Sequence, residues 1–417
     1  MKLRAPNRDD WIYVAPILCF ALAAWLAETT WVRAMEWKTL DWRTQLRAER
    51  GQPPPDERLL VIGIGDRSTK NIELWPFSRA WHAQLQALIQ PESPSVLVWD
   101  IIYGNRVGLN GIPLDGDADA DFAASTDFLA ENGIDTVFAA VSYAAPTGDD
   151  PSQLGTTEPL TRIVGRLDQI FGDEYFDMPF PGLRESGHIG AVDAPRGAGG
   201  IVRRMPMVVR VGDVVFPSLA LQAAMLHWEI AASDVEVRLD DAIELGGNGG
   251  GRRIPIDGAG MMLLNYRYEP IQPGEALGRE MPTVEYYDLL IDLHQKHVVK
   301  APDAKAPVPL RDGIMLIGEF ATDSGTTPRS DLTPLVYLHA NALNNILQDD
   351  YVRPVPSAWV WTIAIALGLL GAFFIRHTPI WVAAGYAITG LATYAGRAQW
   401  AWENGNWWLP NVAPVAG

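Results

Sequence analysis

The hydrophobic pattern of residues 58–105 contains two apolar runs and one helical stripe between them. Leu59–Ile64 and Val96–Ile102 are continuous apolar runs rich in β-branched residues, and each is followed by glycine or polar residues. Arg79–Ile89 places its apolar side chains at helical spacing and is followed by two prolines. Continuous apolar strands are typical of a sheet that is covered on both faces. The stretch therefore predicts a strand–helix–strand unit in a covered, parallel sheet.

Further elements follow along the chain. Asp121–Glu131 predicts a helix and Asp135–Tyr143 predicts a third strand, whereas residues 144–186 show little periodicity. Two β-rich runs, Arg203–Val211 and Val214–Phe216, flank a Gly-Asp pair and predict a hairpin. The remaining predicted elements are strands at 188–192, 261–266 and 314–318, and helices at 217–227, 283–293 and 336–348.

The order of these elements predicts the fold class. No linker between residues 51 and 356 is long and polar enough to separate two domains. We therefore predict one α/β domain over 51–356, with a mostly parallel central sheet plus a β-hairpin. Residues 31–48 alternate apolar and charged positions at helical spacing, so we expect a stalk helix within 28–50 that ends before three prolines.

Three segments are nearly free of charge: 11–27, 358–375 and 380–396. Each is slightly shorter than the roughly 20 residues of a spanning helix, but flanking tryptophans can complete the length. Twelve of the sixteen tryptophans lie in or near these segments, as in an interfacial belt. We therefore predict that the domain is attached to three transmembrane helices, with the truncated start of a further span at 408–417. A cleaved signal peptide is the alternative for 11–27, although a convincing cleavage site is missing.

Basic residues predict the orientation of these spans. Lys2, Arg4 and Arg8 lie in the segment 1–10 before the first span, and Arg376 lies between the last two. Because short cytoplasmic segments carry an excess of basic residues, we expect 1–10 to be cytoplasmic and the large domain to be extracytoplasmic. More basic residues follow the first span, so a cytosolic domain is the alternative.

Charge and ligand-type residues exclude several classes of function. The net charge of −17 argues against binding to nucleic acid or to anionic lipid. The only cysteine is Cys19, and the histidines do not show the spacing of a metal motif. The acidic run 115–121 resembles the start of a calcium loop but lacks the glycine and glutamate that should follow, so a solvated acidic loop is favoured over a cation site. The sequence predicts no metal and no cofactor.

Catalytic and nucleotide-binding motifs do not occur in the sequence. Gly63-Ile64-Gly65 lacks the third glycine of a dinucleotide fingerprint, so a tight turn is the better interpretation. There is no P-loop, no nucleophile elbow and no Cys–His pair. We therefore predict that this chain is not an enzyme.

Two groups of residues are candidates for ligand binding. Trp75-Pro76 precedes the helix that carries Arg79, near the carboxyl ends of predicted strands, where open α/β sheets bind ligands. Packing of the helix start is an equal alternative. Arg203 and Arg204 begin the predicted hairpin, where their guanidinium groups could bind a carboxylate or phosphate, or pair with acidic residues of the same domain.

Taken together, these segments resemble the CHASE2 family of extracytoplasmic sensor domains in bacterial transmembrane signalling proteins. At the position of Gly65 the family is expected to carry an acidic residue, for which only Asp66 could substitute, whereas Asp323 is retained. The similar blocks, in order, are LDWRTQLR (40–47), LLVIGIGDRS (59–68), WPFSRAWHAQLQAL (75–88), VLVWDIIY (96–103), GIVRRMPMVVRVGDVVFPSLAL (200–221), LLNY (263–266), IMLIGEFATDSG (314–325) and LHANALNNIL (338–347).

The resemblance implies a sensory input module in the bacterial cytoplasmic (inner) membrane. Its output domain, such as an adenylate cyclase, histidine kinase or Ser/Thr kinase, would lie beyond residue 417 or on another chain. The implied partners are the membrane, a small-molecule or envelope ligand and a second copy of the chain. A non-catalytic, membrane-anchored assembly module that binds other envelope proteins is the alternative. The candidate ligand-binding residues are Asp66, Trp75, Arg79, Asp100, Arg203, Arg204, Asn265 and Asp323.

Overall fold

The computed structural model divides the chain into two compact units. One unit is Gln52–Tyr351, and the other combines Met1–Gly51 with Val352–Gly417. The first predicted span and the segment before it lie outside the described residues. The structure describes residues 29–50, 52–104, 116–145, 155–247, 250–269, 281–301, 310–320 and 323–410.

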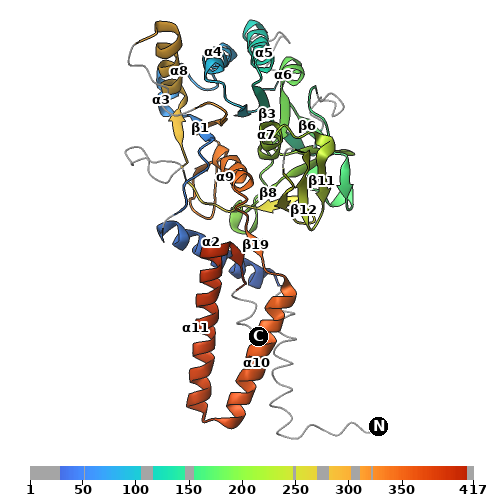
Figure 1. The fold of residues 1–417 in the computed structure, drawn as a ribbon, viewed down its shortest axis with the longest axis vertical. Helices are drawn as coiled ribbons and strands as arrows, with labels where there is room; N and C mark the ends of the chain where they lie inside the picture. Colours follow the sequence, from blue (N-terminus) through green and yellow to red (C-terminus); the bar gives the residue numbers. More distant parts are fainter. Residues whose placement is uncertain are drawn as a thin grey trace. The chain divides into compact units, whose positions relative to one another are not determined.

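A mostly parallel sheet forms the centre of the unit Gln52–Tyr351 (Figure 1). Its strand order is β15-β1-β16-β2-β3-β6, and β7 also pairs with β3. Only β6 runs antiparallel to its neighbour within this sheet. The predicted mixed α/β class with a mostly parallel central sheet is therefore confirmed. The strands are β1 (Leu59–Ile64), β2 (Val96–Asp100), β3 (Asp135–Tyr143), β6 (Tyr175–Asp177), β7 (His188–Ala191), β15 (Thr283–Glu285) and β16 (Ile314–Glu319).

The strand–helix–strand unit predicted at the start of the domain is present, but its two strands are not neighbours in the sheet. β1, α4 (Arg79–Ile89) and β2 form where expected, but β16 lies between the two strands. Ile317 of β16 is opposite Ile62 of β1 on one side and Trp99 of β2 on the other. Because every residue of β16 is buried, this strand fits a central position, covered on both faces.

Alternate side chains of the central strands enter two different cores. In β1, Leu60 and Ile62 face a core shared with α4, α5 and α8, whereas Leu59 and Val61 face a core shared with α7 and α9. The two groups of helices lie on opposite sides of the sheet (Figure 1). The helices are α3 (Asp66–Asn71), α5 (Gly116–Glu131), α6 (Pro181–Ser186), α7 (Leu219–His227), α8 (Tyr286–His294) and α9 (Val336–Leu347).

Two predicted elements differ from the structure. The first strand of the hairpin is interrupted: Arg204–Pro206 (β8) pairs with Met261–Leu263 (β14), and only Val208–Val211 (β9) forms the hairpin, with Val214–Pro217 (β10). Its direction changes at Met207, between the two pairings. The predicted helix 283–293 begins instead with β15, because Thr283 and Val284 extend the central sheet next to β1.

The smaller sheets complete this unit. One has the order β13-β12-β11-β4 and another has the order β10-β9-β5. β17 (Ser324–Gly325) and β18 (Thr333–Pro334) form a separate short pair. The strands of the two smaller sheets that have not yet been given are β4 (Arg162–Val164), β5 (Gly172–Asp173), β11 (Val235–Arg238), β12 (Ala242–Leu245) and β13 (Arg252–Pro255).

In its described residues the other unit contains three long helices. They are α2 (Thr30–Arg50), which coincides with the predicted stalk, α10 (Ser357–His377) and α11 (Ile380–Gly405). Arg43 of α2 donates to the Leu409 carbonyl at 2.8 Å, and Arg47 donates to Asn406 Oδ1 at 3.1 Å. A short parallel pair joins β19 (Arg353–Pro354) to β20 (Trp407–Trp408).

The predicted spans at 358–375 and 380–396 coincide with α10 and α11. Of the helices in the described part of the chain, none has the combined length and apolarity needed to cross a membrane. Attachment to membrane spans therefore stays a prediction. Of the predicted further span at 408–417, residues after 410 lie outside the described ranges.

Candidate functional site

The carboxyl ends of β1, β16 and β2 meet where the chain leaves the sheet in opposite directions. β1 and β2 are followed by α4 and α5, which pack on one face, whereas β16 is followed by α9 on the other face. In open α/β sheets such a divergence forms the crevice in which ligands bind. Asp100 and Glu319 are the last residues of β2 and β16, so two carboxylates lie at this place.

Four titratable residues form a cluster here, which we call the carboxyl-end cluster: Asp100, Glu319, Asp323 and His339. His339 comes from the first turn of α9, is only 2% exposed, and places Nε2 at 3.7 Å from Asp100 Oδ1. Within the described ranges, its Nδ1 has no hydrogen-bond partner. Glu319 accepts a hydrogen bond from the backbone N–H of Asp323 at 2.7 Å. The cluster thus joins β2, β16 and α9.

Burial changes the ionisation of this cluster. It raises the pKa of Asp100 to about 7 and lowers the pKa of His339 to about 3. Burial, together with the charges of Asp100 and Glu319, raises the pKa of Asp323 to about 6. Asp323 is exposed at the rim, whereas the side chain of Asp100 is 7% exposed, so burial acts more strongly on Asp100. Near neutral pH the cluster holds a neutral imidazole and a carboxyl group close to its midpoint.

A further carboxylate at this edge explains the glycine at position 65. Glu285, the last residue of β15, accepts hydrogen bonds from the backbone N–H groups of Gly65 at 3.4 Å and Arg67 at 3.3 Å, and from the Ser68 hydroxyl. A Cβ atom on residue 65 would lie 2.6 Å from Glu285 Oε1. A side chain at position 65 is therefore incompatible with this contact. The acidic group at this strand end comes from the neighbouring strand.

The structure does not bring the eight predicted site residues together. Asp100 and Asp323 belong to the carboxyl-end cluster. The side chain of Asp66 is 82% exposed and pairs with Lys70 at 3.2 Å. Trp75 packs at the start of α4, with its ring centroid 5.2 Å from that of Phe77.

The three predicted arginines make contacts within the protein. Arg79 is 1% exposed, pairs with Asp119 at 2.6 Å, donates to the Gly104 carbonyl at 2.6 Å and lies over the Phe180 ring. Arg203 is buried and donates to the Ala198 carbonyl at 2.8 Å. Arg204 pairs with Asp257, which is the alternative that the sequence left open for it.

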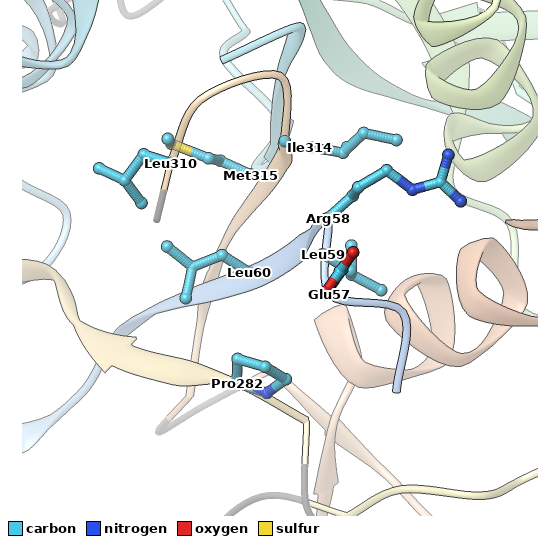
Figure 2. A pocket seen from close by; sticks show the side chains of 9 residues that line it. Glu57, Arg58, Leu59, Leu60, Pro282, Leu310, Ile314 and Met315 are labelled. Carbon is cyan, nitrogen blue, oxygen red and sulfur yellow. The ribbon is translucent and has the colours of Figure 1, made fainter. Parts of the chain in front are cut away.

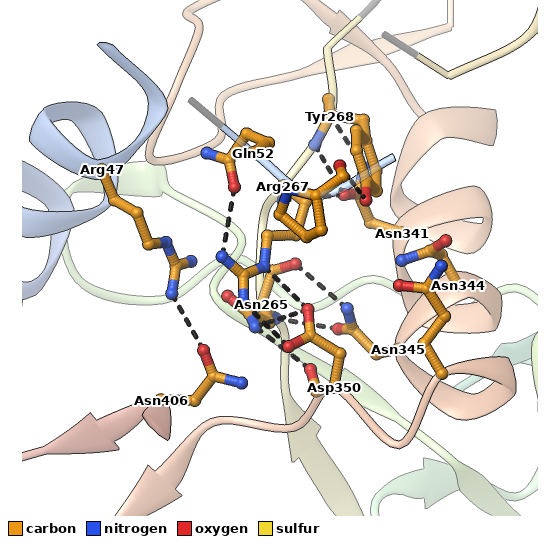
Figure 3. A network of polar contacts seen from close by, with 12 residues as sticks. Arg47, Gln52, Asn265, Arg267, Tyr268, Asn341, Asn344, Asn345, Asp350 and Asn406 are labelled. Carbon is orange, nitrogen blue, oxygen red and sulfur yellow. Dashed lines mark hydrogen bonds and ion pairs between the residues drawn. The ribbon is translucent and has the colours of Figure 1, made fainter. Parts of the chain in front are cut away.

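Asn265 belongs to a different polar network, which we call the α9 amide network (Figure 3). Asn345 of α9 accepts a hydrogen bond from the Asn265 backbone N–H at 2.9 Å and donates to the Asn265 carbonyl at 3.1 Å. Asn341 accepts from the backbone N–H groups of Arg267 and Tyr268, and donates to the Tyr268 carbonyl. The side chains of α9 thus bind an extended segment much as a neighbouring strand would.

This network also holds both ends of the unit Gln52–Tyr351. Arg267 forms two bonds to Asp350, at 2.7 and 2.8 Å, and donates to Gln52 Oε1 at 3.2 Å. Asn344 of α9 accepts from the backbone N–H of Asp56 at 2.9 Å. Arg267 therefore links Gln52 and Asp350, near the two ends of the unit, and Asn344 links Asp56 to α9 (Figure 3).

Sequence reasoning missed five functional candidates: Glu285, Glu319, His339, Arg267 and Asp350. Glu319 carries a usable signal, because it ends an apolar strand in the same way as Asp100. His339 carries none, since all residues of α9 are buried and its pattern does not single out one face. Arg267 and Asp350 become partners only through the tertiary fold.

A pocket of about 200 Å³ lies away from the carboxyl-end cluster (Figure 2). It is at the amino ends of β1 and β16, and its walls are mainly apolar. Among the residues that the structure describes, no group of His, Cys, Asp and Glu has an arrangement that could hold a metal ion. The pocket is lined by Glu57, Arg58, Leu59, Leu60, Pro282, Leu310, Gly313, Ile314 and Met315.

Comparison with known families gives one match. The family model described as CHASE2 domain matches residues 17–374, which confirms the resemblance seen in the sequence. CHASE2 domains are extracellular sensory domains and are non-catalytic. No curated protein and no solved structure matches the chain.

Proposed function

The chain belongs to the CHASE2 domain family, and on that premise we propose that it is the extracytoplasmic input module of a bacterial transmembrane signalling receptor. The unit Gln52–Tyr351 is the sensor. Segments 11–27, 358–375 and 380–396 cross the cytoplasmic membrane and carry the state of the sensor to a cytoplasmic output domain. The candidate site is the carboxyl-end cluster.

The position of α9 is the observation that carries this proposal. Its first turn bears His339 of the carboxyl-end cluster, and its later turns bear the asparagines of the α9 amide network. That network binds Gln52 and Asp350, which adjoin the connections to α2 and α10. An α-helix moves largely as a rigid element within a packed core. A displacement at His339 is therefore delivered to both connections of the sensor.

The stimulus acts through its different affinity for two arrangements of α9. A ligand that binds both arrangements equally shifts nothing, however tightly it binds. Coupling free energies of allosteric proteins are typically about 1–3 kcal/mol. A difference of this size at the carboxyl-end cluster would be enough to change the output several-fold.

Hydrogen exchange of the full chain in lipid nanodiscs tests the role of α9 at one fixed pH. We expect His339→Gln to change exchange at residues 52–58 and in the last turns of α9. Asp66→Asn is the matched control, because Asp66 lies at the same sheet edge and is exposed. Asp100→Asn perturbs the cluster from β2 and serves as the second variant. If His339→Gln and Asp100→Asn change hydrogen exchange only in their own surroundings, α9 does not transmit a displacement from the cluster to residues 52–58. The assembly-module alternative is then favoured.

Labelling of intact cells tests the proposed orientation. The side chain of Leu74 is 86% exposed, so a cysteine there is accessible without unfolding. A membrane-impermeant maleimide should label Leu74→Cys in intact bacterial cells as fully as in permeabilised cells. Labelling that requires permeabilisation would place the sensor unit in the cytosol and contradict the proposal.

A further inference from the structure

We infer that the carboxyl-end cluster is a proton-binding site, in which protonation of Asp100 changes the contact between β2 and the first turn of α9. The ligand class is the hydrogen ion itself, so this site requires no cavity. The link from this site to the receptor output depends on the function proposed above. The site itself does not.

The described surroundings of Asp100 provide no fixed positive charge. Among the described residues its one charged or titratable contact within ion-pair distance is His339, at 3.7 Å, which is too long for a hydrogen bond. Buried carboxylates are normally paired with a cation or saturated by donors, because an unpaired charge in a protein core is strongly unfavourable. Among the residues that the structure describes, Asp100 has neither a cation nor a hydrogen-bond donor, so this environment favours the neutral, protonated carboxyl.

Within the described ranges, the other elements packed against Asp100 add only negative or neutral groups, and β3, the strand next to β2, carries Asp135 and Tyr143. Glu319 comes from β16, and Asp323 follows the same strand. On α9 the other titratable side chain is Tyr337, whose hydroxyl is bonded to Thr283. α7 carries only His227, which contacts Ser95 at the opposite end of β2. A proton is therefore the charge that can relieve the repulsion within the cluster.

Loss and gain of the proton have different structural consequences. The protonated Asp100 carboxyl can donate its O–H to the neutral imidazole of His339, which closes the 3.7 Å gap. The ionised carboxylate instead repels Asp323 and Glu319, and needs solvent or a donor. Asp323 stands at the exposed rim, where the proton can be exchanged with water. The position of α9 thus depends on whether Asp100 holds a proton.

The ionisation of the cluster supports this arrangement. Burial raises the pKa of Asp100 to about 7, so that the group titrates where environments around a bacterium change. The neighbouring charge of Asp100 contributes to the raised pKa of Asp323, so the two protonations are coupled. Burial holds His339 neutral throughout this range.

Infrared difference spectroscopy of the full chain in nanodiscs, between pH about 5.5 and about 8, tests the inference directly. Carboxyl groups with ordinary pKa values are already ionised at the lower pH and do not contribute. We expect a band of protonated carboxyl to be lost with a midpoint near pH 7, and this loss to be absent from Asp100→Asn, whereas Asp323 contributes a separate loss at lower pH. Asp66→Asn, an exposed acid at the same edge, should leave the band unchanged.

A second variant keeps the inference testable if Asp100→Asn folds poorly. Asp323→Asn removes a like charge beside Asp100, so the midpoint of the band should move to lower pH. A wild-type chain without a loss near pH 7, a loss near pH 7 that persists in Asp100→Asn, or a midpoint of that loss that Asp323→Asn leaves unchanged would overturn the inference. Hydrogen exchange at a single pH tests the proposed function separately, so either can fail without the other.

Discussion

The two ends of α9 bury polar side chains in different ways. At the carboxyl-terminal end, Asn341 and Asn345 use both the oxygen and the nitrogen of their amides in hydrogen bonds of 2.8–3.2 Å. At the amino-terminal end, His339 has one contact of 3.7 Å to Asp100, and its Nδ1 has no partner among the described residues. Buried polar groups are almost always satisfied, so an exception calls for an explanation.

The difference separates a structural role from a responsive one. Amides do not titrate, so the α9 amide network holds its geometry at every physiological pH. The carboxyl-end cluster consists of groups whose charge depends on the environment, and burial makes that charge energetically important. One helix therefore carries a fixed attachment at one end and an adjustable contact at the other, which is the arrangement a sensor needs.

The largest expected effect is at the fixed end. Arg267→Ala should lower the free energy of unfolding by about 3–5 kcal/mol, because it leaves the largely buried Asp350 carboxylate without its cation. Arg204→Ala is the matched control: the Arg204–Asp257 pair is much more exposed, and its loss should cost at most about 1 kcal/mol. Urea unfolding of the full chain in detergent measures both. Equal losses of stability in Arg267→Ala and Arg204→Ala would show that the α9 amide network does not hold this end of α9 in place.

At the adjustable end the expected effect has the opposite sign. The pKa of Asp100 is raised to about 7 in the folded chain, so the folded state binds a proton that the unfolded state releases, from pH about 4 upward. Stability from this group is present at low pH and is lost as the pH rises to about 7. Asp100→Asn should therefore match the wild type near pH 4 and be more stable by about 2–4 kcal/mol near pH 8.

A pH series of urea unfolding measures this effect. Asp66→Asn serves as the exposed control and should stay within about 0.5 kcal/mol of the wild type at every pH. A loss of stability in Asp100→Asn at all pH values would mean that the ionised carboxylate is well accommodated. The amino-terminal end of α9 would then not differ from the carboxyl-terminal end in its response to pH.

A smaller effect distinguishes the asparagines of the fixed end from each other. Asn345→Ala leaves the buried N–H and carbonyl of Asn265 without partners, so we expect a loss of about 2–4 kcal/mol. Asn344→Ala is a neighbouring variant of equal volume that frees only the N–H of Asp56, and should lose about half as much. Denaturant midpoints of the two variants test this ratio. A larger loss of stability for Asn344→Ala than for Asn345→Ala would contradict the expectation that two hydrogen bonds stabilise the fold more than one.

The sequence could predict an element of the fold only where the signal for that element lies within a short segment of the chain. β1, β2, β16 and α4 were predictable, because an apolar run or a helical stripe lies within each segment. The insertion of β16 between β1 and β2 depends on pairing across the whole domain, which no local pattern contains. Similarly, β15 was predicted as helix because its three residues run directly into α8.

The site was predictable only where it lay at strand ends. Asp100 and Asp323 were identified because polar residues follow apolar strands at the edge where α/β sheets bind ligands. Arg79 was also selected, but its charge is neutralised by Asp119 of α5, which sequence spacing did not reveal. His339 escaped attention because a helix buried on all sides does not mark which residue faces the sheet edge.

The last prediction concerns the pH dependence contributed by His339. The pKa of this imidazole is lowered to about 3 in the folded chain, so below pH about 6.5 the unfolded state binds a proton that the folded state does not. Its contribution to stability is therefore lost as the pH falls, opposite in sign to that of Asp100. Relative to the wild type, His339→Gln should gain about 1.4 kcal/mol per pH unit between pH about 6 and about 4.

The same pH series separates the two contributions within the cluster. Since one group takes up a proton on folding and the other releases one, Asp100→Asn/His339→Gln should keep a constant stability difference from the wild type between pH about 4.5 and about 6. Each single variant should deviate there, in opposite directions. If His339→Gln instead follows the wild type at every pH, the imidazole is not held neutral by burial. The amino-terminal end of α9 would then be as fixed as its other end.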